Sequence, residues 1–108
     1  MTRPSRALLA ALYALCGLCA APTASAQNAA LGRDLAATCA NCHGTNGNAR
    51  AGMRSLAGAP PDRIVAAMAD FKNGNQPSTI MQQIAKGYSD AQVQLIADFF
   101  AAQKPTGK

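Results

Sequence analysis

Histidine occurs only once in the 108-residue sequence, at position 43, and this scarcity excludes several kinds of site. A structural zinc site usually needs four Cys or His ligands, whereas the chain after residue 26 offers only Cys39, Cys42 and His43. No segment has the alternating period of a strand, which excludes the βαβ setting of a thioredoxin-like site. The basic residues are dispersed and are not interleaved with aromatic residues, so nothing predicts a nucleic-acid surface.

The sequence also lacks an apolar run long enough for a membrane span. The apolar run at residues 7–21 is too short and badly flanked for one. It follows Arg3 and Arg6 and precedes the small residues Ala24-Ser25-Ala26, an order typical of a secretory signal peptide. We therefore predict that residues 1–26 are removed on export to the periplasm, with a retained anchor as the alternative. The C-x-x-C pair Cys16 and Cys19 lies inside this segment and would leave with it. It is not a haem motif, because Ala20 follows where a haem site needs histidine.

The predicted mature chain, residues 27–108, is long enough for one domain only. It contains eight basic residues and five aspartates, a net charge of +3. Chains of this size are marginally stable without help, and this one is rich in alanine and poor in large apolar residues. A helix bundle without a cofactor would therefore lack sufficient core.

The run Cys39-Ala40-Asn41-Cys42-His43 reads C-x-x-C-H, the pattern for covalent attachment of a c-type haem. The two thiols would add to the haem vinyl groups as thioethers, and the two-residue spacer lets both reach one porphyrin edge. His43 follows directly, so its imidazole can bind the iron from the proximal side. We predict one covalently bound haem c.

The remainder of the chain is predicted to be all-α. Residues 29–38 form a first helix, and the Gly- and Asn-rich segment 44–59 forms a loop. A second helix opens at Pro60 and stops at Asn73-Gly74-Asn75, with Ile64, Met68 and Phe71 on its apolar face. Residues 78–86 form a short helix closed by Gly87. The last helix starts at the capping box formed by Ser89 and Gln92, runs to about Gln103 and buries four residues, Val93, Ile96, Ala97 and Phe100. About four helices would thus wrap around one haem.

The second axial ligand is predicted to be the thioether of Met81. This residue lies 38 positions after His43, far enough along the chain to approach the opposite face of the ring. Met53 is only ten residues from His43, and Met68 belongs to an apolar stripe in which methionine usually fills core space. Met68 and an open iron site remain the alternatives. A His43/Met81 pair fills both axial positions and raises the reduction potential.

These motifs together resemble class I cytochrome c over essentially the whole of residues 27–108. The resemblance rests on the haem motif with Gly44, on Leu56-Ala57-Gly58 and on the Met81 segment before an aromatic helix. Residues 68–74 and 78–90 are also similar to the cytochrome subunit of flavocytochrome c sulfide dehydrogenase, and to one half of diheme periplasmic cytochromes.

The resemblance implies that Cys39 and Cys42 hold the haem, with His43 and Met81 as proximal and distal ligands. It also implies a helix crossing between Gly32 and either Phe99 or Phe100. The family commonly has a proline where this chain has Arg54, and the proline carbonyl accepts the proximal imidazole N–H. The Arg54 carbonyl could still accept that bond, but without the stiffness of proline.

The predicted function is single-electron transfer in the periplasm to or from a redox protein partner, without stable membrane insertion. The partner would be a flavoprotein sulfide dehydrogenase, so that this chain is an electron-transfer protein and not itself an enzyme. The alternatives are a free soluble carrier to a terminal oxidase or peroxidase, a haem enzyme with an open iron site that acts on sulfur compounds, and a gas-binding sensor.

Overall fold

The computed structural model describes residues 24–50 and 52–106. Most of the predicted signal peptide, including Cys16 and Cys19, lies outside these residues. Within the described ranges the chain is helical and has no strand, which confirms the predicted fold class. None of the helices in this part of the chain is long and apolar enough to cross a membrane.

The first described helix, α2, spans Ala24–Ala36 and begins five residues before the predicted start. The 3-10 turn η2 (Ala37–Cys39) and the four-residue helix α3 (Ala40–His43) continue the helical path directly into the haem motif. A second 3-10 turn, η3 (Thr45–Gly47), opens the predicted loop. The cysteines are therefore held on a nearly continuous helical segment.

The other three predicted helices are α4 (Pro61–Asn73), α5 (Met81–Lys86) and α6 (Asp90–Ala101). Helix α4 ends as expected, since Gly74 adopts a left-handed φ of 77° and its N–H bonds to the carbonyls of Asp70 and Phe71. Helix α6 starts at the predicted capping box, in which Ser89 and Gln92 bond reciprocally.

Helix α5 is shorter than predicted, because it begins at Met81 and not at Ser78. Ile80 has a φ of −136°, outside the helical range, and the Ser78 hydroxyl accepts a hydrogen bond from the Gln82 amide. Ser78 thus satisfies an amide of the first turn without joining the helix. Gly87 does end α5, but with a right-handed φ of −76°, so this position does not use the conformational freedom of glycine.

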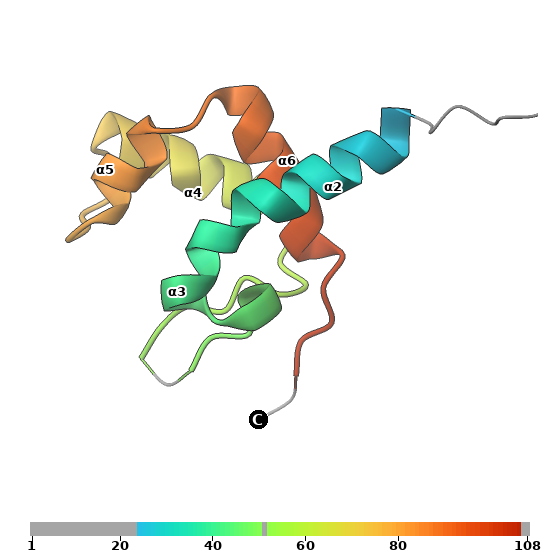
Figure 1. The fold of residues 1–108 in the computed structure, drawn as a ribbon. Coiled ribbons are helices and arrows are strands. Elements are labelled where there is room, and N and C mark those ends of the chain that lie inside the picture. The colour runs from blue at the N-terminus through green and yellow to red at the C-terminus, as the bar shows by residue number, and fades with distance from the viewer. Residues whose placement is uncertain (1–23, 51, 107–108) are drawn as a thin grey trace, which may run out of the picture.

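Helices α2 and α6 cross near the middle of the molecule (Figure 1), and Gly32 makes this crossing possible. A Cβ atom at Gly32 would stand 2.6 Å from the backbone carbonyl oxygen of Leu95. The predicted close approach of the two backbones is present, but it occurs at Leu95, about one turn before Phe99 and Phe100.

The core lies between α2, α4, α5 and α6. The four residues predicted to face inward from α6 are all buried, as are Ile64 and Met68 of α4. Phe71, the third residue of the predicted α4 stripe, packs against this core while remaining half-buried. Single alanines complete the core from the two remaining helices, Ala36 from α2 and Ala85 from α5. The core is small, as expected for a domain organised around a bound group.

Candidate functional site

The haem motif occupies one helical segment, which places its two cysteines on the same side. Cys39 ends η2 and Cys42 lies in α3, three residues further on. Residues three apart on a helix are surface neighbours, so both sulfur atoms can reach one edge of a bound group. Gly44 ends α3 with a φ of 79°, and a Cβ there would clash with the Asn48 carbonyl oxygen. The turn after the motif therefore requires glycine.

The imidazole of His43 is oriented by a backbone hydrogen bond. Its Nδ1 lies 2.7 Å from the carbonyl oxygen of Arg54. A carbonyl oxygen can only accept, so Nδ1–H donates and Nε2 keeps its lone pair for a metal ion. The hydrogen bond that could still form with Arg54 in place of the usual proline is present. Such a bond fixes the tautomer and raises the basicity of the ligating nitrogen.

A cavity of about 610 Å³ opens beside the motif. Cys39, Cys42 and His43 line it, together with the buried side chains of Ile64, Met68 and Phe100. Its volume lies in the range of small-molecule and cofactor sites, and its lining is largely apolar. Together with the two thiols and the free Nε2 of His43, this cavity fits a flat apolar ring with a metal ion at its centre.

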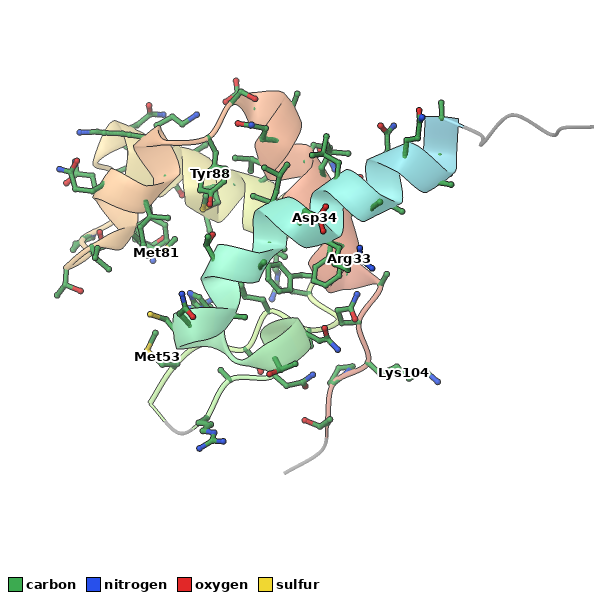
Figure 2. The ribbon with its side chains drawn as sticks, in the orientation of Figure 1. Arg33, Asp34, Met53, Met81, Tyr88 and Lys104 are labelled. Carbon is green, nitrogen blue, oxygen red and sulfur yellow. The ribbon has the colours of Figure 1, made fainter. Side chains whose placement is uncertain are left out.

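All three candidate methionines line this cavity. Met81 is the first residue of α5 and is half-buried. Met68 is only 8% exposed and packs in the core, as its position in the apolar stripe predicted. Met53 is 48% exposed, and Figure 2 shows it close to α3, whereas Met81 lies on the separate helix α5. Met53 thus belongs to the loop that follows α3, and Met81 lines the cavity from the separate element α5.

Burial raises the pKa of the Cys39 thiol above its ordinary value, and a hydrogen bond with Thr38 partly opposes this shift. No group of three or more His, Cys, Asp or Glu side chains that could hold a metal ion occurs within residues 24–50 and 52–106.

A second hollow, of about 640 Å³, lies between the start of α2 and the end of α6. Its lining includes Ser25, Asn28 and Asp98, but no cysteine, histidine or methionine. Ser25 also belongs to the predicted signal peptide. This hollow therefore lacks the ligands that the chemistry of the motif requires.

Two residues beside the cavity were not anticipated from the sequence. Tyr88 lines the cavity, and its hydroxyl shares a 2.8 Å hydrogen bond with that of Thr38, 50 residues earlier. The only local signal was a large amphipathic side chain in the short polar connection between two helices. Such a signal does not specify a partner so distant in sequence.

The comparisons with known proteins agree with this site. The family model described as Cytochrome c matches residues 29–104. The cytochrome subunit of sulfide dehydrogenase from Chlorobaculum tepidum is 40% identical over 88 residues, which cover 82% of this chain and 80% of that protein. The thiosulfate dehydrogenase electron acceptor of Thiomonas intermedia is 37% identical over 75 residues, or 68% of this chain and 35% of that protein. Cytochrome c4 of Pseudomonas aeruginosa is 36% identical over 81 residues, or 74% of this chain and 40% of that protein.

Proposed function

The chain belongs to the cytochrome c family, and we propose that it transfers single electrons through a haem iron held between His43 and Met81. Membership of the family implies a covalently bound haem c, for which Cys39 and Cys42 have the required spacing. It also makes the chain an electron-transfer protein and not an enzyme.

The observation that carries the proposed ligand pair is the orientation of His43. Its Nδ1–H is bonded to the Arg54 carbonyl, so Nε2 is the nitrogen left for the iron. Met81 lines the same cavity from α5 and supplies a neutral sulfur ligand. The bound haem supplies a one-electron couple at its iron. A spectrum of the Met81→Ala variant tests the pair directly.

The protein matrix around the cavity favours the reduced state of such a site. Ile64, Met68 and Phe100 are buried and line the cavity, so they exclude water from its inner part. A low-polarity lining disfavours the extra positive charge of the oxidised iron. The thioether of Met81 acts in the same direction, because His/Met ligation raises the potential. Both features suit an acceptor of electrons from a low-potential donor.

Two exposed apolar side chains, Met53 and Ile80, also line the cavity and form what we call the apolar rim. Met53 is 48% exposed and Ile80 57% exposed. Methionine is enriched in the centre of protein interfaces. The rim therefore suits a protein partner that docks over the cavity opening, as expected for a bound subunit.

We propose a flavoprotein sulfide dehydrogenase as that partner. The support is the similarity to the cytochrome subunit of sulfide dehydrogenase, which extends over most of both chains. In this arrangement the flavin chemistry belongs to the partner, and this chain accepts one electron at a time. A free carrier remains the alternative, and it would not co-purify with a flavoprotein.

The Ile80→Lys variant is expected to accept electrons from the flavoprotein more slowly. Docking would then bury a lysine against an apolar surface, at a cost that weakens binding roughly tenfold or more. The measurement is the rate of haem reduction by flavoprotein and sulfide at increasing cytochrome concentration. An unchanged optical spectrum in the variant would show that the neighbouring Met81 is undisturbed.

Leu31→Lys is the matched control, because Leu31 is 48% exposed on α2 and does not line the cavity. Its rate is expected to match that of the wild type. Equal slowing in the two variants, or no slowing in Ile80→Lys, would contradict docking at the apolar rim.

The proposed location is the periplasm, reached after removal of residues 1–26. Cleavage there would take the first three residues of α2, Ala24, Ser25 and Ala26, and would leave the Gly32 crossing intact. A c-type haem is attached outside the cytoplasmic membrane, so export is consistent with the motif. The intact mass of the exported protein tests this boundary.

A further inference from the structure

One hydrogen bond connects two segments that both line the cavity. The hydroxyls of Thr38 and Tyr88 are 2.8 Å apart, and both residues line the cavity. Thr38 directly precedes Cys39, and Tyr88 lies seven residues after Met81, in the connection from α5 to α6. Figure 2 shows the Tyr88 side chain extending from this connection toward the end of α2. The bond therefore joins the cysteine-bearing segment to the Met81-bearing segment.

Lys72 holds the same tyrosine from a third element. Its ammonium group, in the last turn of α4, donates to the Tyr88 carbonyl at 2.8 Å and to the Asp90 carboxylate at 3.1 Å. The carbonyl bond is partly buried, whereas Asp90 is fully exposed. The ion pair therefore adds little, and the charge-assisted bond to Tyr88 is the stronger contact.

Helix α5 depends on such contacts because it is very short. It has six residues, well below the length at which an isolated helix is stable in water. Ala85, the fifth of these six residues, is fully buried, and the Ser78 hydroxyl accepts from the backbone N–H of Gln82 near the start of the helix. Beyond its end, the chain is fixed by the side chain and the carbonyl of Tyr88. Loss of either hydrogen bond of Tyr88 would free the end of the segment that begins with Met81.

We propose that Tyr88 is a positioning residue. It bridges Thr38 and Lys72 and so holds the Met81 segment at a fixed separation from the Cys39–His43 segment. This inference rests on the proposed ligand role of Met81. A segment fixed in this way keeps the thioether facing the site, so an outside ligand cannot easily take its place. When the contacts of Tyr88 are lost, the segment samples more positions, and the Met81 sulfur competes less well with an outside ligand.

The test is the affinity of the oxidised holoprotein for imidazole, followed by the loss of the weak sulfur–iron band near the red end of the visible spectrum. Tyr88→Phe keeps the ring and removes one hydroxyl, and it is expected to bind imidazole about two- to tenfold more tightly than the wild type. Thr38→Val removes the same hydrogen bond from the other side and is expected to have a similar effect. The imidazole affinity of the double variant should exceed that of either single variant by no more than a small factor, because both substitutions delete the same interaction.

The lysine contact is tested with Lys72→Met, which keeps most of the aliphatic stem and loses the ammonium group. It is also expected to tighten imidazole binding. Lys104→Met is its control, since Figure 2 shows this side chain extending from the C-terminal segment, away from Met81. The control should bind imidazole like the wild type.

Wild-type imidazole affinity in both Tyr88→Phe and Thr38→Val would overturn the positioning role. A lowered unfolding midpoint with unchanged imidazole affinity would do so too, because it would show that the bond only stabilises the fold. If the wild type shows the sulfur–iron band, these results leave the proposed ligand pair standing. If the wild type lacks the band, the ligand pair and the positioning role fail together.

Discussion

Replacement of both motif cysteines, in the variant Cys39→Ala/Cys42→Ala, is expected to abolish covalent haem attachment. The two thiols lie on one helical segment beside the cavity, and no other cysteine is present after residue 26. The exported wild type should have the mass of residues 27–108 plus one haem, and the variant the mass of its chain alone. Haem that stays bound to the chain during denaturing electrophoresis should likewise be absent from the variant.

The same variant is expected to fold poorly. The core of this small domain surrounds the cavity, and Ile64, Met68 and Phe100 line it directly. Without a bound group these side chains lose a packing partner, and domains of this size have little stability to lose. The control is Met53→Leu, which alters a cavity-lining side chain but keeps both thiols. Retained covalent haem in the double-cysteine variant, or its loss from the control, would contradict attachment through Cys39 and Cys42.

The Phe100→Ala variant is expected to have the largest effect on stability among single core substitutions. Phe100 is 1% exposed, packs in the core between the helices and lines the cavity. Removal of a buried phenyl ring leaves a cavity and costs about 3–5 kcal/mol of unfolding free energy. In a domain of this size the melting temperature should fall by more than about 10 °C.

Phe99→Ala is the control for this prediction. The two rings meet edge to face with centroids 5.2 Å apart, but Phe99 is only half-buried. Its loss should therefore cost clearly less in denaturant unfolding of the oxidised holoprotein. Equal losses from the two variants would show that the core is not centred on Phe100.

Local signals in the sequence predicted the parts of the fold that local interactions determine. Ser89 and Gln92 form the expected capping box, and Gly74 ends α4 in the left-handed conformation. Both features depend on residues within four positions of one another. The start of α5 was predicted three residues too early, because a hydroxyl at Ser78 can cap an amide without being part of the helix.

The roles of the two cysteines and the histidine were predicted from spacing alone, because the chemistry of attachment requires them to be neighbours, and these roles stay predictions. The acceptor for the His43 imidazole was anticipated at Arg54 only from the family resemblance, and the 2.7 Å hydrogen bond confirms it. The bond from Thr38 to Tyr88 could not be predicted, since it joins residues 50 positions apart. Neither residue lies in a local sequence pattern that predicts contact with the other.

The optical spectrum of the exported protein, oxidised and reduced, beside that of Met81→Ala, tests the proposed ligand pair most directly. We expect a low-spin c-type spectrum in the wild type, with a weak sulfur–iron band that disappears in the variant. High-spin iron in the wild type, or the same band in Met81→Ala, would contradict ligation by His43 and Met81.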